Sequence, residues 1–120
     1  MFEISVESSF HAQHAVKIQG VEELPHFHDW KVVVQIGGPK LNEDGVLIDF
    51  LELEENLKEI LSEFQDSNLN LHHCLGQNNP SAENVAKYIG NCIQDRIEPP
   101  NMLTTVTVTE APNCKAIYHP

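Results

Sequence analysis

The sequence predicts an α+β fold in which one antiparallel sheet carries two helices on one of its faces. Alternating apolar and polar residues near both ends of the chain are typical of half-buried strands, whereas two central segments repeat apolar residues at helical spacing. No long crossover separates the strands, so the predicted order β-β-α-α-β-β favours antiparallel hairpins. A chain of 120 residues has the length of one domain, and we expect residues 1–120 to form a single unit around one core.

The two N-terminal strands are expected around residues 2–7 and 26–36. Apolar and polar residues alternate along the first segment with the period of two that a half-buried strand requires. The second segment places valine and isoleucine at alternate positions, and the Gly-Gly-Pro sequence at 37–39 ends it.

The first helix is expected to begin at Asp49, whose side chain can accept a hydrogen bond from the first free amides. Glu52, three residues later, completes the spacing of a capping box. The apolar residues that recur at helical spacing are Phe50, Leu53, Leu57, Ile60, Leu61 and Phe64. A polar loop that contains histidines is expected over residues 65–79.

A second helix is expected to follow, with Pro80 in its first turn, where the missing N–H costs no hydrogen bond. Its buried stripe would consist of Val85, Ile89, Cys92, Ile93 and Ile97. Residues 98–101 end this helix, and two further strands are expected over 103–110 and 115–119.

The charge balance excludes several classes of partner. The chain has 18 acidic and 7 basic residues, a formal net charge of -11, which argues against a surface for nucleic acid or an anionic membrane. No apolar run approaches the roughly 20 residues of a membrane span, and Glu3 and Glu7 interrupt any signal-peptide pattern at the N-terminus. The three cysteines form no C-x-x-C pair, so we expect a reducing, cytoplasmic location.

The histidines carry the functional prediction. His26 and His28 lie two residues apart at the start of a predicted strand, so their rings project from one face. His14 lies near the end of the first strand or just past it, and a hairpin would bring all three imidazoles together. Three neutral imidazoles leave one open tetrahedral position, as in a catalytic zinc site. Spacing alone leaves open the alternative that these are surface histidines brought together by chance.

Six segments in order along the chain resemble the motifs of one family: residues 10–14, 26–32, 44–53, 72–75, 79–86 and 106–110. In this order they resemble F-x-A-x-H, H-G-H-N-(Y/W)-x-V, D-x-x-G-x-(V/I)-x-D-F-x-x-L, the second half of L-D-H-x-x-L, N-P-T-S-E-N-(I/V)-A and V-x-V-x-E-T. The sequence therefore resembles the 6-pyruvoyl-tetrahydropterin synthase / 6-carboxytetrahydropterin synthase family.

This resemblance implies a fold, a cofactor and a set of site residues. The implied architecture is the tunnelling fold, in which ββααββ units close their sheets into a barrel within a homo-oligomer, a trimer or a hexamer. The implied Zn²⁺ ligands are His14, His26 and His28. Glu110 would anchor a pterin substrate, since a carboxylate can accept two hydrogen bonds from the 2-amino group and the adjacent ring N–H.

The chain departs from the family where the catalytic cysteine usually stands, a few residues before H-x-H. Glu23 fits the spacing E-x-x-H-x-H of a branch in which glutamate replaces that cysteine. Members of this branch resemble enzymes that cleave the side chain of dihydroneopterin triphosphate and give 6-hydroxymethyl-dihydropterin. Glu23 is then a candidate general acid/base. In the alternative interpretation, Glu22 and Glu23 are two loop carboxylates of a very acidic chain.

Two further departures affect the predicted chemistry. The Asp-His pair of the family falls on Leu71 and His72, so His72 can still carry a proton but lacks its usual partner. A shift of one residue would pair His72 with His73 instead, and the role of Cys74 stays open. The arginine that often follows the first zinc histidine is Ala15, and a chain with few cations is a poor match for a triphosphate.

The function predicted from these residues is that of a zinc-dependent pterin lyase with active sites near subunit boundaries, acting on the side chain of 7,8-dihydroneopterin or its triphosphate. One alternative is the formation of 6-carboxy- or 6-pyruvoyl-tetrahydropterin in the same fold. Another is a pterin- or purine-binding protein without catalytic activity.

Overall fold

The computed structural model describes all 120 residues and has the predicted α+β architecture. The elements in chain order are β1 (Phe2–His14), β2 (Lys17–Ile18), β3 (Val21–Glu22), β4 (His26–Gly38), α1 (Phe50–Leu61), β5 (Ser67–Asn68), a 3-10 turn (Leu69–Leu71), α2 (Ala82–Gln94), β6 (Met102–Ala111) and β7 (Cys114–Tyr118). No helix is long and apolar enough to cross a membrane.

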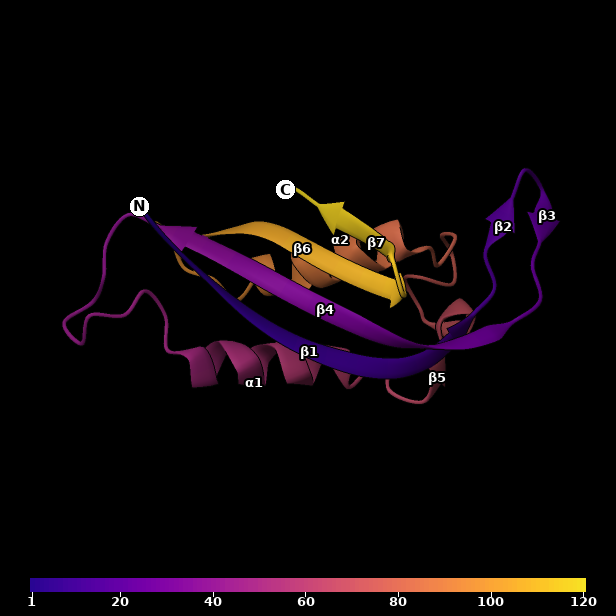
Figure 1. Ribbon diagram of the computed structural model, residues 1–120, viewed down its shortest axis with the longest axis horizontal. Helices are drawn as coiled ribbons and strands as arrows, with labels where there is room; N and C mark the ends of the chain where they lie inside the picture. The colour runs from indigo at the N-terminus through magenta and orange to yellow at the C-terminus, as the bar shows by residue number, and fades with distance from the viewer.

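The main sheet has five strands in the order β5-β1-β4-β6-β7 (Figure 1). Only the two-residue strand β5 is parallel to its neighbour, and all the longer strands pair antiparallel, as predicted. The strands β1 and β4 pair over 13 residues each, from Phe2 opposite Gly38 to His14 opposite His26. This register alone places two of the predicted zinc ligands directly across from one another.

Both helices pack on the same face of the sheet. The three strands and both helices contribute to one core cluster of 23 buried residues on this face. Its members from the strands are Val6, Phe10 and Ala12 of β1, Trp30, Val32, Val34 and Ile36 of β4, and Leu103, Val106 and Val108 of β6. Within this cluster Trp30 is fully buried and stacks on Phe10 at 5.5 Å between ring centroids, and its indole N–H donates to the Ala12 carbonyl at 3.1 Å. The helix α1 runs along β1, whereas α2 lies behind β6 and β7 in Figure 1.

The helix boundaries follow their caps. Asp49 caps α1 as predicted, and its carboxylate accepts from the Leu51 amide at 2.9 Å. For α2 the N-cap is Ser81, whose hydroxyl accepts from the Asn84 amide at 3.2 Å. The prediction that Pro80 lies in the first turn is therefore wrong, because Pro80 precedes the cap.

Three predicted members of the helical faces occupy other positions. Phe64 is buried, but it lies in the turn that follows the end of α1 at Leu61. Phe50, the first residue of α1, is 52% exposed because the core begins one turn later. Ile97 is buried, but α2 ends at Gln94, and the chain reaches Ile97 through single turns.

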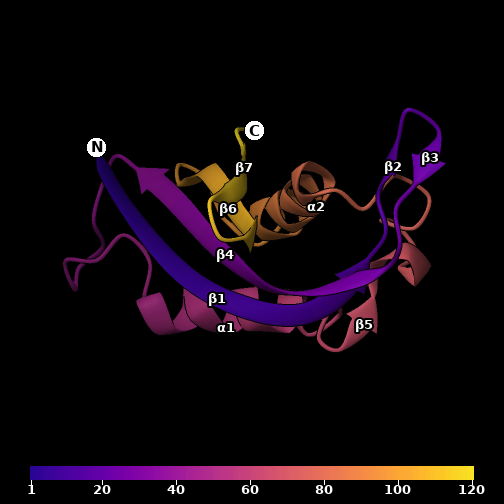
Figure 2. The ribbon, with the colours of Figure 1, turned by 45° about the vertical axis from the view of Figure 1, so that its right-hand side comes forward.

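The segment between His14 and His26 forms a small hairpin of its own, which sequence periodicity did not predict. Its strands β2 and β3 are two residues long and are joined by Gln19 and Gly20, both with positive φ (52° and 80°). Positive φ at both turn positions is the signature of a type I′ turn, which matches the twist of a tight hairpin. Figure 2 shows this β2–β3 hairpin projecting from the end of the curved β1–β4 ribbon.

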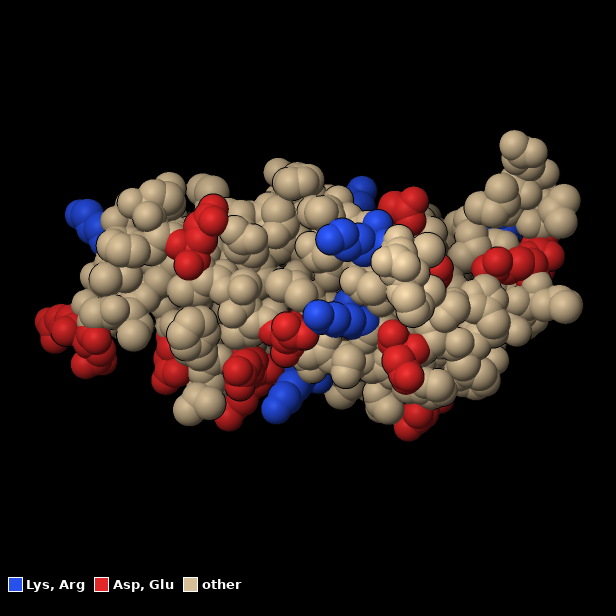
Figure 3. Space-filling model, in the orientation of Figure 1, with Lys and Arg blue, Asp and Glu red and all other residues tan.

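The second face of the sheet is open. Its residues include Ser5, Glu7, Ser9, Thr105, Thr107 and Thr109, none of which is buried. This face is turned toward the viewer in Figure 3, where most of the surface is neither Lys/Arg nor Asp/Glu and acidic side chains gather along the edge that carries α1. The outer edge of β7 is unpaired, and β5 covers only two residues of β1.

We expect this chain to assemble with copies of itself, because open strand edges are usually covered by pairing or by another element. Light scattering at micromolar concentration should therefore give a mass several times the 13.5 kDa of one chain. A stable monomer under those conditions would contradict both the barrel and any site shared between subunits.

Candidate functional site

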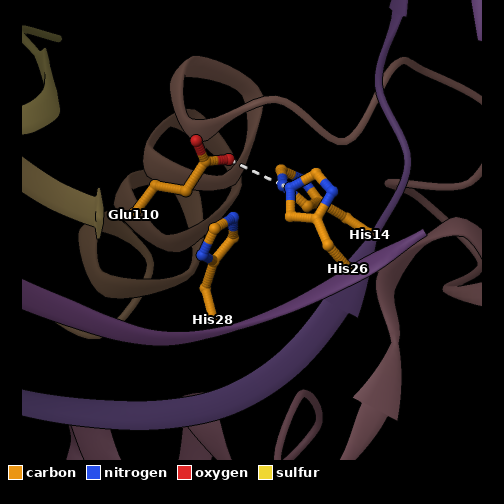
Figure 4. A group of neighbouring side chains, drawn as sticks. All are labelled: His14, His26, His28 and Glu110. Atoms are coloured by element: carbon orange, nitrogen blue, oxygen red, sulfur yellow. Dashed lines mark hydrogen bonds and ion pairs between the residues drawn. The ribbon is translucent and has the colours of Figure 1, made fainter. Parts of the chain in front are cut away.

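Four side chains converge where β1, β4 and β6 come together at one end of the sheet (Figure 4). His14 is the last residue of β1, His26 and His28 begin β4, and Glu110 lies near the end of β6. The register sets His14 opposite His26 and Ala12 opposite His28. All four residues are on the helix-covered face, and their nearest ligand atoms lie within 4.8 Å of one another.

Backbone carbonyls orient two of the rings. His14 Nδ1 lies 2.7 Å from the Pro80 carbonyl, and His26 Nδ1 lies 3.1 Å from the Leu24 carbonyl. A carbonyl only accepts, so each Nδ1 carries the proton and donates it, leaving each Nε2 directed at the centre of the group. Metal-binding histidines are commonly held by a second hydrogen bond of this kind.

The donor set at the centre fits a cation. Nε2 of His14 and Nε2 of His26 lie 3.0 Å apart, although the carbonyl contacts make both nitrogens acceptors. Glu110 Oε1 lies 2.7 Å from the same His14 nitrogen, and Nε2 of His28 is buried without a hydrogen-bond partner. A metal ion bound between these atoms would satisfy all of them.

Burial favours the neutral form of His28, which is the form that could bind a cation. Removal from water lowers the pKa of His28 below its ordinary value of 6.5, the Glu110 charge works in the opposite direction, and the neighbouring histidines lower it further. A lowered pKa keeps the imidazole neutral near pH 7, which is the form that binds a metal.

Glu23 lies beside this group. It follows β3, and its Oε1 accepts from the Val16 amide at 2.9 Å while lying 3.7 Å from His26 Nε2. Its side chain is 42% exposed. A pocket of about 260 Å³ connects it with the group and is lined by Val16, Ile18, Glu23, His26, Ser81, Ala82, Glu83 and Glu110. Glu23 and Glu110 therefore face one space next to the imidazoles.

His72 lies elsewhere in the chain. It follows the 3-10 turn, and neither the four-residue group nor the pocket lined by Glu23 includes it. Its Nε2 contacts Glu63 Oε2 at 3.0 Å instead. The contact of Glu63 with His72 was not predicted from the sequence. Glu63 follows α1, and nothing in its neighbours distinguishes it from the acidic residues within that helix.

Two other histidines next to these residues are placed differently. His11 lies on the open face of the sheet, where its Nδ1 contacts Asp29 Oδ1 at 2.8 Å and its ring stacks on Phe27. His73 is exposed next to His72, with ring centroids 4.3 Å apart.

Comparison with known proteins agrees with this architecture. Residues 3–120 match the family model described as 6-pyruvoyl tetrahydropterin synthase. The chain belongs to this family. The resemblance found in the six sequence motifs is thereby confirmed.

Curated relatives of this family member carry related names. Dihydroneopterin monophosphate aldolase of Pyrococcus furiosus is 34% identical over 94 residues, covering 78% of this chain and 76% of the relative. The 6-carboxy-5,6,7,8-tetrahydropterin synthase of Rickettsia conorii is 29% identical over 108 residues, covering 74% and 78%. All of these names refer to enzymes that act on or form pterins.

Solved structures share the fold. The 6-pyruvoyl tetrahydropterin synthase of Caenorhabditis elegans superposes with a TM-score of 0.86 at 20% identity, covering 99% of this chain and 95% of that one. The Plasmodium falciparum protein of the same name gives a TM-score of 0.81 at 23% identity, covering 99% and 97%. The predicted tunnelling fold is confirmed by these matches.

Proposed function

We propose that this member of the family is a zinc-dependent lyase that cleaves the side chain of a phosphorylated 7,8-dihydroneopterin and releases 6-hydroxymethyl-dihydropterin. The observation that carries the proposal is the position of Glu23, 3.7 Å from His26 Nε2 and in one pocket with Glu110. A carboxylate in the place of the family cysteine is a proton carrier beside the imidazole group. The Pyrococcus furiosus relative, named an aldolase, supports a carbon–carbon cleavage.

The proposed metal ligands are His14, His26 and His28. Three imidazole Nε2 atoms that face one point, with a position left open, are typical of a catalytic zinc site. Zn²⁺ bound there would polarise an oxygen of the substrate side chain. The Pro80 and Leu24 carbonyls would fix the ring orientations before the ion arrives.

The proposed role of Glu23 is to move one proton twice. Its carboxylate takes the proton of the hydroxyl on the second side-chain carbon, and the bond from that carbon to the ring-linked carbon breaks. The oxygen becomes the carbonyl of the departing aldehyde, and the electron pair moves onto the ring-linked carbon and the pterin. Glu23 then returns the proton to that carbon, which gives the hydroxymethyl group. A glutamate is also described as the catalytic residue of the Plasmodium vivax protein, 21% identical.

Glu110 is proposed to anchor the pterin ring. One of its oxygens contacts His14, and its carboxylate also lines the pocket beside Glu23. Glu110→Gln should raise KM about 10- to 100-fold, the effect of losing a charged hydrogen bond, with a smaller change in kcat. Steady-state kinetics with metal analysis checks this. A loss of bound metal in Glu110→Gln would instead identify Glu110 as a fourth ligand.

His72 is proposed to serve the same reaction in a neighbouring copy of the chain. Because it lies outside the pocket of its own chain, it can meet a substrate bound beside Glu23 only across a subunit boundary. This proposal depends on the homo-oligomer expected from the open sheet edges.

A substrate with one phosphate is a better match than a triphosphate. The chain has only seven basic residues, and no Lys or Arg lines the pocket that contains Glu23. The Pyrococcus furiosus relative is named for a monophosphate.

Two other functions have some support. The names of the family and of the Rickettsia conorii relative favour formation of 6-pyruvoyl- or 6-carboxy-tetrahydropterin. Leu71 in place of an aspartate favours a binding protein without catalysis.

A single experiment separates these three functions. The zinc-loaded protein is incubated with dihydroneopterin, its monophosphate and its triphosphate, and the products are identified by mass. Release of 6-hydroxymethyl-dihydropterin with a two-carbon aldehyde, fastest from the monophosphate, is expected. A 6-carboxy- or 6-pyruvoyl-tetrahydropterin product would favour the synthase reaction. Tight binding without turnover would favour a binding protein without catalytic activity.

A further inference from the structure

His72 is nearly buried and fully hydrogen-bonded within its own chain. Its side chain is 8% exposed, whereas Leu71, at the position where the family pattern has an aspartate, is 82% exposed. Leu71 has no carboxylate to offer the ring. A carboxylate nevertheless contacts the imidazole, and it comes from a different part of the fold.

That carboxylate is Glu63, two residues beyond the end of α1. Its Oε2 lies 3.0 Å from His72 Nε2, and the same oxygen accepts the Tyr88 hydroxyl at 2.9 Å. Tyr88 belongs to α2, so three separate segments meet at this one oxygen. The ring of His72 also packs against Tyr88 and Phe64, at 4.9 Å and 5.2 Å between ring centroids.

The second ring nitrogen identifies the tautomer. His72 Nδ1 accepts from the amides of Cys74 and Leu75, each at 3.2 Å, so this nitrogen carries no proton. The proton is on Nε2 and is donated to Glu63. Both ring nitrogens of His72 therefore have hydrogen-bond partners within this chain.

The charges agree with this arrangement. Burial by itself would raise the pKa of Glu63, but the hydrogen bonds from His72 and Tyr88 outweigh it and lower the pKa below the ordinary 4.5. Burial and the Glu63 carboxylate both raise the pKa of Tyr88, so its hydroxyl stays a donor. Glu63 is thus an anion with two fixed donors.

We propose that Glu63, held by Tyr88, is the carboxylate partner of His72 and fixes its ring for proton transfer at Nδ1. Glu63 is a positioning residue that acts through His72, and its effect on catalysis rests on the function proposed above. The ring takes a proton at Nδ1 by releasing its two long amide contacts. Nε2–H remains bound to Glu63, and the anion stabilises the imidazolium that forms.

Glu63→Gln tests this pairing because the amide has nearly the same shape and no charge. A glutamine can still accept from Nε2–H through its Oε1, and the Cys74 and Leu75 amides still donate to Nδ1, so the ring keeps its tautomer but loses the negative charge that stabilises the imidazolium. We expect kcat to fall at least about tenfold, as when a catalytic histidine loses its carboxylate partner, with KM and bound metal unchanged. Tyr88→Phe keeps the carboxylate and loses one donor, so its kcat should lie between those of wild type and Glu63→Gln.

The matched control is Glu59→Gln. Glu59 lies on α1, four residues before Glu63, and it tethers this helix to the segment after α2 through Arg96 at 3.0 Å. Glu59→Gln weakens a charged contact that holds α1 in place, as Glu63→Gln does at the end of the helix, but it leaves the contacts of His72 unchanged. Equal losses of kcat in Glu59→Gln and Glu63→Gln would overturn the proposal, as would a larger loss in Tyr88→Phe than in Glu63→Gln.

A measurement independent of activity uses nitrogen-15 NMR of labelled histidines, with His72→Gln to assign the signals. The wild-type spectrum should show His72 with a protonated Nε2 and a bare Nδ1. The Nε2–H proton signal, which a hydrogen bond to a carboxylate shifts downfield, should move upfield in Glu63→Gln and stay in place in Glu59→Gln. A protonated Nδ1 in the wild type, or an Nε2–H signal that does not move in Glu63→Gln, would overturn the pairing. If no pterin is converted by the wild type, the proposed function fails while this spectrum still decides the role of Glu63.

Discussion

Glu23→Gln is expected to lower kcat by about 10²–10⁴, the usual contribution of a general acid or base. The amide keeps the size of the side chain and can still accept from the Val16 amide, so the end of the β2–β3 hairpin should keep its position. Glutamine cannot take the hydroxyl proton, however, and the chemical step loses its proton carrier. Bound zinc and pterin affinity should change little, because the ligand nitrogens and Glu110 are untouched. Steady-state kinetics, metal analysis and a binding titration measure the three quantities.

Glu22→Gln is the matched control for this variant. Glu22 is adjacent to Glu23 in sequence, and Glu22→Gln also removes one negative charge. Glu22 nevertheless lies on β3 opposite Lys17, and the pocket beside the imidazole group does not include it. Its kcat should stay within about twofold of wild type, as for an exposed side chain remote from the chemistry. Similar losses in both variants, or no loss in either, would refute the assignment of Glu23 and favour the binding protein without catalysis.

His26→Ala is expected to remove both the bound metal and the activity. Of the three imidazoles His26 is suited to the test because it is partly exposed, whereas His14 is fully buried and its truncation would also leave a cavity. Two imidazoles bind zinc much more weakly than three, since a stable catalytic site needs three protein ligands. Elemental analysis should find about one zinc per chain in the wild type and close to none in the variant.

His11→Ala controls for the loss of a histidine from the same ribbon. His11 lies on the open face and contacts Asp29, so its removal should leave metal content and kcat unchanged. Full zinc occupancy in His26→Ala would refute the ligand assignment, and metal loss in His11→Ala would show that the open face takes part.

The sequence was sufficient for the parts of the fold that repeat with a regular period. Alternation in the strands and the apolar stripes of the helices predicted the sheet, its antiparallel pairing and the face covered by α1 and α2. The spacing of His26 and His28, with His14 on the preceding strand, predicted which rings meet, because a long hairpin transmits its register to its end.

Other features could not be predicted from local patterns. The strands β2 and β3 are two residues long, too short for any period, and only the positive φ of Gln19 and Gly20 defines their turn. Glu63 reaches His72 through the tertiary packing of α1 against the loop, which no linear motif records. The direct contact of Glu110 with His14 likewise depends on how β6 ends beside β4.

The ladder between β1 and β4 makes the imidazole group a consequence of core packing. The same register that buries Phe10 and Trp30 directs His14, His26 and His28 to one point, and a slip of one residue would send every one of these side chains to the opposite face. The arrangement of the proposed ligands is therefore preorganised by apolar contacts that need no ion. A chelator should remove the metal and leave a folded apo-form that can bind metal again. A zinc finger, in contrast, unfolds when its metal is removed.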